Sequence, residues 1–481
     1  MRRHAPRFCL VFSRIVITCA LGASAAACAP DLTIGASSTT TTTTDTTTGT
    51  GGGAGTTATG GGGAGGAIAG GAVKWAQSAD WEGDDIATGV VFSDGAALIT
   101  GESVDADNTI RALGVSIEPS GFAAFVGSGT GHGGLAIAAD PTGVTFVAGY
   151  LFGTTEDLPG DGSPVTSGGN DCLLWRTSPE LSDPRKIGTS GDSACNAVAT
   201  KDTDALFVAG TFSGKLDDTL GSGAIESKGD YDLFVARLDR TGAGADVAWS
   251  FGDADDQRLR ALVRDGAGAL HVLADDRGPK GHGGSDLWLL TLDESGSVLD
   301  DRHYGTADEE RAQALAVGSD GTTVIAGQLV PYEGKTTPID LGGGAVGGVA
   351  FLAAFDASHN HVWSHGVEDP DGYVKIAALV RDADGNTYVG GSFTSEMTVA
   401  GRSFVALGGE DGFVLKLDSK GDLVWAHALA NAQAAAVRGL AFAASGSLIV
   451  AGDFQTEVRV EGAKVLDGST GRDVFAMGID P

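Results

Sequence analysis

The stretch VATKDTDALFVAGTFSGKLDDTLGSGAIESKGDYDLFVARLD, residues 198–239, decides the fold of this chain. Its first part, residues 198–210, contains two runs of small and β-branched residues joined by a turn rich in Asp. Runs of this kind predict two β-strands with a tight connection between them. Its last part, residues 232–239, alternates hydrophobic residues between two aspartates and predicts a third strand.

The two-strand pattern recurs along the chain. Its copies lie at residues 90–101, 137–149, 198–210, 262–274, 315–327, 379–391 and 440–452. Third strands follow the copies, and strands with a central Trp come next at residues 246–253, 360–367 and 422–429. Successive copies begin roughly 50–60 residues apart, which leaves room for four strands in each, and four-stranded repeats on this scale predict a β-propeller.

Asp and Trp recur at fixed places in these copies. The third strand is bracketed by aspartates, at Asp232 and Asp239, Asp286 and Asp293, Asp411 and Asp418, and Asp473 and Asp480. Because they recur from copy to copy, we interpret them as turn and cap residues rather than catalytic ones. For the same reason, we interpret the tryptophans of the fourth strand as packing residues between repeats rather than as sugar-stacking rings.

The last copy ends at VFAMGIDP, residues 474–481, and has no Trp strand of its own. The missing strand is AVKWAQS, residues 72–78, at the other end of the domain. A ring that joins its two ends within one sheet leaves no free edge at the seam. The sequence therefore predicts an all-β fold: a seven-bladed β-propeller of four-stranded blades over residues 72–481, closed by an N-terminal strand in the last blade.

The repeats resemble the bacterial seven-bladed β-propeller repeats of the SBBP type, whose pattern is GxF-G…G-DxFVxKLD-xxG-xxxW. The best copy is GTFSGKLDDTLGSGAIESKGDYDLFVARLDRTG, residues 210–242, and the resemblance covers the chain from about residue 72 to the end. It implies a secreted or lipid-anchored propeller. It implies almost nothing about chemistry, because the molecular functions of that family are mostly unassigned.

The first 28 residues have the features of an export signal, with arginines followed by a short apolar run that ends in small residues. ASAAAC, residues 23–28, resembles a bacterial lipobox with Cys28 as the lipid-bearing residue, although Ala25 stands where that family usually has Leu. Ordinary cleavage at the Ala-x-Ala site is the alternative, and it would leave Cys28 as a free thiol. Residues 29–71 are rich in Thr, Gly and Ala and predict a disordered linker.

Cys172 and Cys195 remain in the body of the chain. In an exported protein, two cysteines in neighbouring repeats are candidates for a disulfide. Two separate buried thiols are the alternative. A free Cys28 would leave three cysteines outside the cell, whereas lipidation of Cys28 leaves these two as an even pair, and this parity favours lipidation.

The net charge of −31 and the pI of about 4.4 exclude nucleic acid as a partner, because phosphates require Lys and Arg. They also exclude a basic membrane-docking surface, so we expect contact with the membrane only through the N-terminal lipid. The expected location is the cell envelope, as an outer-membrane lipoprotein, or the outside of the cell. The expected partner of this monomer is an envelope or extracellular protein or a glycan.

Acidic residues gather in the connections that lead into the first strands of the repeats, which meet at one face of a propeller. They predict a rim that binds a cation such as Ca²⁺ or a basic partner, formed by Asp84, Asp85, Asp255, Asp256, Glu309, Glu310, Asp369 and Asp371. Arg258, Arg260, Arg311 and Lys375 follow closely in the sequence and would neutralise part of this charge. Solvated loop charge on an acidic protein is the alternative.

No motif for catalysis or nucleotide binding stands up to inspection, and no catalytic residue is predicted. We therefore expect a binding or scaffold module whose ligand the sequence does not name. The alternative is a hydrolase or lyase acting on polysaccharide or cell wall with carboxylates at the mouth. A close pair of carboxylates with raised pKa in a pocket would favour the enzyme, and carboxylates spread round a shallow rim would favour the binding module.

Overall fold

The computed structural model describes residues 71–80, 83–125, 132–155, 165–176, 182–216, 220, 223, 225–240, 246–278, 280–331, 334–369, 373–431 and 433–481. The predicted signal, Cys28, the linker up to residue 70 and Asp371 lie outside these residues. Within the described part, no helix has the length and apolar character needed to cross a bilayer. The described strands all belong to one compact unit, Thr40–Pro481.

The first four sheets are antiparallel and have four strands each. The first contains β2 (Asp84–Ser93), β3 (Ala96–Val104), β4 (Ile110–Glu118) and β5 (Gly121–Phe125). The second contains β6 (His132–Ala139), β7 (Thr145–Thr155), β8 (Val165–Arg176) and β9 (Ser182–Ile187). The third contains β10 (Ser193–Lys201), β11 (Ala205–Phe212), β14 (Asp232–Asp239) and β15 (Val247–Phe251). The fourth contains β16 (Gln257–Arg264), β17 (Leu270–Asp276), β18 (Asp286–Leu292) and β19 (Val298–Tyr304).

The later sheets are larger. A six-stranded sheet contains β20 (Glu309–Val317), β21 (Thr323–Val330), β24 (Ala350–Phe355), β25 (His361–Glu368), β28 (Glu396–Val399) and β29 (Arg402–Val405). An eight-stranded sheet contains β26 (Val374–Arg381), β27 (Thr387–Phe393), β30 (Asp411–Leu417), β31 (Leu423–Ala430), β32 (Ala435–Phe442), β33 (Leu448–Val460), β34 (Ala463–Ile479) and β1 (Val73–Ala79). Two short hairpins pair β12 (Lys215–Leu216) with β13 (Ile225–Glu226) and β22 (Ile339–Asp340) with β23 (Ala345–Val346).

The eight-stranded sheet consists of two four-strand runs, β26-β27-β30-β31 and β32-β33-β34-β1. They are joined where the end of β31 meets the far end of β33, at Leu429↔Val460 and Ala430↔Arg459. The four-strand repeat expected from the sequence therefore recurs in the larger sheets as well.

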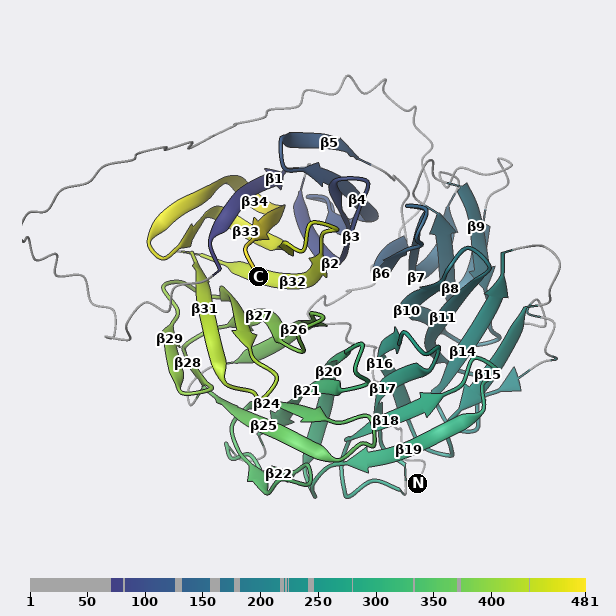
Figure 1. Cartoon of the computed structure of the whole chain (residues 1–481). Coiled ribbons are helices and arrows are strands. Elements are labelled where there is room, and N and C mark those ends of the chain that lie inside the picture. Colours follow the sequence, from purple (N-terminus) through teal and green to yellow (C-terminus); the bar gives the residue numbers. More distant parts are fainter. Residues whose placement is uncertain are drawn as a thin grey trace, which may run out of the picture. The chain divides into compact units, whose positions relative to one another are not determined.

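The first strands of these repeats pack side by side in a closed cycle. Each lies beside the next in the order β2, β6, β10, β16, β20, β26 and β32, and β32 in turn lies beside β2. Figure 1 shows them around the middle of the ring, with the later strands of each repeat farther out. This arrangement of sheets around a centre is a β-propeller.

The N-terminal strand β1 pairs antiparallel with β34 near the C-terminus, from Val73↔Ile479 to Ala79↔Val474. The pairing between the two ends of the domain expected from the sequence is thus present. Lys74 adds an ion pair with Asp480 at 2.7 Å. As a result, β34 has β33 on one side and β1 on the other.

Each first strand carries one extra residue at the same register position. These β-bulge residues are Thr88, Leu135, Asn196, Arg260, Gln313, Ala377 and Arg438. A bulge leaves its extra residue out of the strand pairing and re-aims that side chain. The bulges therefore present one side chain per repeat that does not belong to the regular alternation.

Apolar side chains fill the space between neighbouring repeats, and the fourth-strand tryptophans take part. Trp363 on β25 is 7% exposed and Trp425 on β31 is 1% exposed. The turn of the next repeat lies directly against Trp363, because a Cβ on Gly421 would come within 2.8 Å of its ring. Gly421 also has a φ of +87°, which favours glycine. The interpretation of these tryptophans as packing residues is confirmed.

The recurring aspartates act in turns and caps, as predicted. The Oδ1 of Asp293 accepts hydrogen bonds from the backbone N–H groups of Ser295 and Ser297, both at 2.8 Å. Asp411, which is fully buried, accepts backbone hydrogen bonds from Leu407 and Asn431 at 2.9 and 3.0 Å. These contacts tie turns and loops to the strands that follow them.

Cys172 on β8 and Cys195 on β10 form a disulfide, with their Cα atoms 4.8 Å apart. The bond joins two neighbouring sheets. Both cysteines belong to an apolar cluster that also contains Leu174, Val208 and Phe234. The covalent link therefore lies within the packed interface between these repeats.

Candidate binding site at the mouth of the ring

The prediction of an acidic rim must be corrected, because three of its eight residues are buried in the structure. Asp85, Glu310 and Asp369 are each 1% exposed. A side chain with so little exposure cannot present its carboxylate to a ligand in solution. Asp85 and Glu310 lie on the first strands β2 and β20, and Asp369 lies in the connection between β25 and β26. The sequence could not separate them from their neighbours, because each stands next to a residue of higher exposure.

The exposed members of the rim are largely engaged with other residues. Asp84 accepts a hydrogen bond from the backbone N–H of Arg472 at 3.0 Å. Asp256 pairs with Arg258 at 3.1 Å. Glu309 pairs with Arg277 at 2.9 Å and with Arg311 at 3.3 Å.

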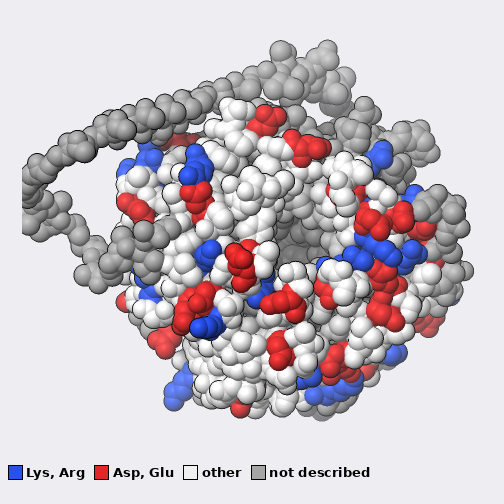
Figure 2. All heavy atoms as spheres, in the orientation of Figure 1, with Lys and Arg blue, Asp and Glu red and all other residues white. Residues whose placement is uncertain are grey.

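Asp255 is exposed, and Asp371 lies outside the described residues. Figure 2 shows Lys and Arg side chains interspersed with Asp and Glu on the face in view. The described rim is therefore a mixture of both charges rather than a continuous acidic surface.

Glu310 forms a buried carboxyl pair with Asp286 of the preceding repeat, and the two groups lie close enough to influence each other's pKa. Burial raises the pKa of both groups, although backbone hydrogen bonds from His282 to Asp286 and from Thr306 to Glu310 oppose the rise. The proximity of Asp286 raises the pKa of Glu310 further. This is a close pair of carboxyl groups with raised pKa, but both are 1% exposed and serve the junction between two repeats.

Gln257 on β16 corresponds to Glu310 on β20. Each stands three residues before the β-bulge residue of its own strand, Arg260 and Gln313. The Gln257 side-chain oxygen accepts a hydrogen bond from the N–H four residues earlier, Asp253, at 3.1 Å. Glu310 does the same with the N–H of Thr306 at 2.8 Å. At equivalent positions, the neutral side chain of Gln257 and the side chain of Glu310 accept the same backbone hydrogen bond. A protonated, neutral Glu310 would therefore resemble a glutamine at this position.

We expect the variant Glu310→Gln to be more stable than the wild type at neutral pH, with the gap widening as pH rises. The folded pKa of Glu310 lies above its unfolded value, so its contribution to stability is complete in acid and is lost as pH rises through the folded pKa. Melting temperatures measured between pH 4 and 8 test this. Glu309→Gln, a partly exposed neighbour, is the matched control, and parallel melting curves for wild type and Glu310→Gln would contradict the assignment.

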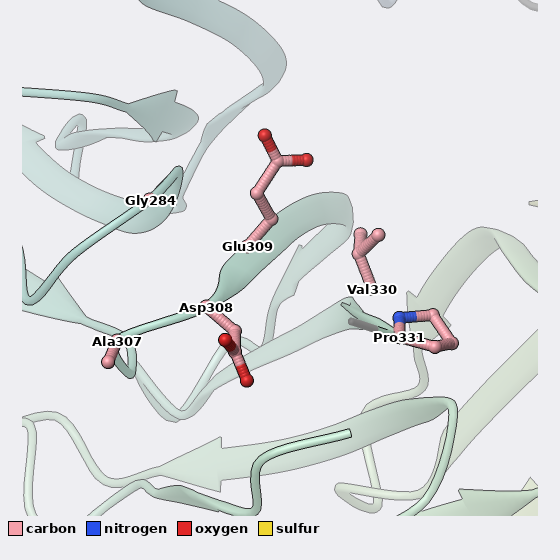
Figure 3. A pocket seen from close by; sticks show the side chains of 6 residues that line it. All are labelled: Gly284, Ala307, Asp308, Glu309, Val330 and Pro331. Carbon is pink, nitrogen blue, oxygen red and sulfur yellow. The ribbon is translucent and has the colours of Figure 1, made fainter. Parts of the chain in front are cut away.

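A hollow of about 440 Å³ lies between the β16 and β20 repeats, lined by Gly284, Ala307, Asp308, Glu309, Val330 and Pro331. Figure 3 shows the side chains of Asp308 and Glu309 pointing in different directions from it. Asp308 also accepts a hydrogen bond from the hydroxyl of Thr337. These two carboxylates therefore do not form a facing pair of the kind used in glycoside hydrolysis.

Five charged residues gather instead at the junction between the β26 and β32 repeats. This charged cluster consists of Lys375, Glu410, Arg438, Asp453 and Arg472. Asp453 is fully buried and lies between the two arginines. Arg438 donates to it from Nε at 2.7 Å and from Nη2 at 3.3 Å, and Arg472 donates to its Oδ1.

Glu410 links the cluster to the β26 repeat. It accepts a hydrogen bond from the hydroxyl of Ser392 at 2.7 Å and pairs with Arg472 at 3.4 Å. Burial works to lower the pKa of Arg438, but Asp453 and Glu410 outweigh it and raise that pKa. The two arginines and two carboxylates thus satisfy one another.

Lys375 is the remaining charge, and its ammonium group makes no ion pair or hydrogen bond with another described residue. Burial and the nearby Arg438 and Arg260 lower its pKa to about 8, although Asp453 and Glu410 oppose the shift. With all groups ionised, the cluster has three cationic side chains and two carboxylates. It carries one positive charge in excess, within a protein whose net charge is −31.

Sequence reasoning placed Lys375 at the mouth but missed the other members of the cluster. Arg438 is a bulge residue, and Asp453 is 15 residues further along, on the next strand. Glu410 lies in the loop before β30, and Arg472 lies on β34. The repeat register was the available signal, because Arg260 with Asp275 occupies the same pair of positions in the β16 repeat, with Nε donating to Oδ2 at 2.8 Å.

The described residues contain no group of three His, Cys, Asp or Glu side chains arranged to hold a metal ion. Asp382, in the turn between β26 and β27, accepts backbone hydrogen bonds from Asp384 and Asn386 at 3.0 and 2.9 Å. The mouth thus offers ion pairs and an unpaired amine rather than a carboxylate cage.

No family model and no curated protein matches this sequence. Among solved structures, the chain is similar to a protein of unknown function from Dyadobacter fermentans, with 10% identity over 86% of this chain and 100% of that one, and a TM-score of 0.43. It is similar to the β-propeller domain of the Trilobed protease from Pyrococcus furiosus, with 10% identity over 83% and 97% and a TM-score of 0.42. The WD40 domain of Neurospora crassa Pan2 gives 10% identity over 82% and 88% and a TM-score of 0.40.

At this level of sequence identity and TM-score, the similarity supports no conclusion about function. The sheets and their closed cycle of first strands define the class: this is an all-β propeller protein. The resemblance to SBBP-type repeats stays a prediction from the sequence.

Proposed function

We propose that the protein is an exported propeller, anchored by lipid at Cys28, that serves as a binding module in the cell envelope. The proposal counts seven blades, with the β32 repeat completed by β1. Its ligand, an envelope or extracellular protein or glycan, docks at the mouth where the first strands begin. The Thr-rich segment before residue 71 would hold the ring away from the membrane.

The observation that carries the proposal is the charged cluster. Its five side chains come from β26, β32, β33, β34 and the loop before β30, so a rigid set of strands holds most of them in place. A buried charge without a partner costs stability, and such costs persist mainly where function needs them. Lys375 is half-buried and has no charged or hydrogen-bonding partner among the described residues, so part of this cost applies to it.

The enzyme alternative has less support. The carboxyl pair Asp286 and Glu310 has raised pKa but no access to solvent, and Asp308 and Glu309 point apart in the neighbouring hollow. A glycosidase needs two carboxylates that face one substrate bond.

Affinity capture with the full-length protein tests the binding function. Wild type, Lys375→Met and the control Lys420→Met are each immobilised and exposed to envelope extract. Lys420 is exposed in the turn between β30 and β31. We expect wild type and Lys420→Met to retain the same component and Lys375→Met to lose it. Equal retention by all three, or by none, would count against a ligand at this mouth.

Labelling of cells with a fatty acid tests the anchor separately. We expect the wild-type chain to take up label and Cys28→Ala to take up none. Equal label in the two would contradict lipidation at Cys28, while leaving the binding function open to its own test.

A further inference from the structure

We propose that the charged cluster binds an oxyanion of the ligand, a carboxylate, sulfate or phosphate group, with Lys375 as the residue that receives it. This inference rests on the proposed binding function and names the chemistry of its ligand. It depends on three features of the cluster: where Lys375 points, which of its neighbours are already paired, and what charge is missing.

The position of Lys375 follows from the pairing of β26 with β27. Lys375 lies opposite Ser392 in this antiparallel pair, so the two side chains lie on the same face of the sheet. Ser392 donates to Glu410 at 2.7 Å, and Glu410 pairs with Arg472 of the β32 repeat. Lys375 therefore faces the junction with that repeat, and Figure 1 shows β26 and β32 next to each other near the middle of the ring.

The two carboxylates near Lys375 are already committed. Asp453 receives both arginines of the cluster, with Arg438 bound through two of its nitrogens. Glu410 receives Ser392 and Arg472. Neither carboxylate hydrogen-bonds to the Lys375 ammonium group, and within the part of the chain that the structure describes its donors are available for a molecule from outside.

The missing charge is negative. Burial contributes most to disfavouring the protonated form of Lys375, and the repulsion by Arg438 and Arg260 adds to it, while Asp453 and Glu410 oppose it. An oxyanion beside Lys375 would offset this repulsion and complete the charge balance of the cluster. A cation would add to the excess, so the chemistry of this site is opposite to that expected of the acidic rim.

Tyr373 adds a surface for the rest of the ligand. Its side chain is 38% exposed, and its backbone is fixed to the end of β27 through hydrogen bonds with Thr394 at 2.9 and 3.1 Å. Its phenol lies close enough to Arg438 to influence that group. The aromatic ring of Tyr373 beside the cationic Lys375 suits a ligand in which an anionic group is attached to a less polar portion of the molecule.

The test follows the titration of Lys375 by NMR in full-length protein labelled at lysine ¹³Cε. In a buffer that contains only chloride, we expect a midpoint near pH 8. Added inorganic phosphate, sulfate or glucuronate at matched ionic strength is expected to raise the midpoint by about one unit, since an anion that binds the protonated amine ten times more tightly shifts it by that amount. The resonance of Lys420 is the control and should not move.

The three probes distinguish the sources of the oxyanion. A shift with glucuronate identifies a carboxylate ligand, a shift with sulfate a sulfated one, and a shift with phosphate a phosphorylated one. No shift of Lys375 with any probe overturns the inference. If the shift is absent while Lys375→Met still loses the component that wild type captures, the proposed binding function is supported and the oxyanion ligand is contradicted. If wild type also captures nothing, both proposals are contradicted.

The melting temperature of Lys375→Met shows whether a loss of binding comes from unfolding. Replacing Lys375 with Met removes an unpaired charge from a half-buried site, so we expect its melting temperature to equal or exceed that of wild type. Loss of the captured component together with a lowered melting temperature would instead indicate a structural role and contradict the assignment.

Discussion

A chain that lacks residues 72–78 should melt roughly 10 °C below the full-length protein, or fail to fold cooperatively. The deletion removes all of β1 except Ala79, and β1 pairs with β34 along Val73–Ala79. It also removes Trp75, which packs against an apolar cluster that contains Ile99, Val115 and Val474. The free edge of β34 would then be open to solvent and to other chains.

The matched control is a deletion of similar kind within residues 40–60. We expect this second variant to melt within about 1 °C of the parent, because a Thr/Gly/Ala segment of this composition cannot contribute a packed face. Differential scanning calorimetry measures both. Identical melting of the two deletions would mean that β1 is dispensable and that the seam does not close the ring.

Replacement of Asp453 with Asn should cost about 3 kcal/mol of unfolding free energy, the usual effect of removing one partner from a buried ion pair. Asp453 is fully buried and receives both Arg438 and Arg472, so its loss leaves Arg438 without its hydrogen-bonded carboxylate and Arg472 with Glu410 alone. Lys375 lies in the same field and would be repelled further. Urea unfolding monitored by tryptophan fluorescence gives the change.

Two comparisons identify the cause. Asp467→Asn removes an exposed carboxylate that pairs with the exposed Lys464 at 2.7 Å, and we expect a change below about 1 kcal/mol. The double variant Arg438→Met with Asp453→Leu removes the charges together and should recover much of the lost stability. A double variant as unstable as Asp453→Asn would show that shape rather than charge decides the effect.

The repeat could be predicted because strand pattern and turn chemistry are local. Alternating residues in 198–210 and 232–239 determine their strands, and recurrence of the pattern identified β1 as the missing fourth strand of the last repeat. Asp293 and Asp411 were assigned to turns and caps because recurrence argued against catalysis, and their backbone hydrogen bonds agree.

The mouth was harder to predict because burial there changes from one residue to the next. Glu309 and Glu310 are adjacent in the sequence, yet one pairs with arginines at the surface and the other is 1% exposed beneath a loop. The charged cluster joins residues as far apart as Lys375 and Arg472. Composition indicated an acidic rim, whereas the pairing of the arginines with Asp453 and Glu410 leaves a local excess of positive charge.

The β-bulge in each first strand has a consequence for how such a protein can diversify. The bulge residues are a threonine, a leucine, two arginines, an asparagine, a glutamine and an alanine, while the strand pairs on either side of them keep the same register in every repeat. Because the extra residue stands outside the pairing, it can change without a slip of its strand. Mutation can therefore change the side chain that the bulge presents in one repeat at a time, and a change at Arg438 would alter the charge beside Lys375 most directly.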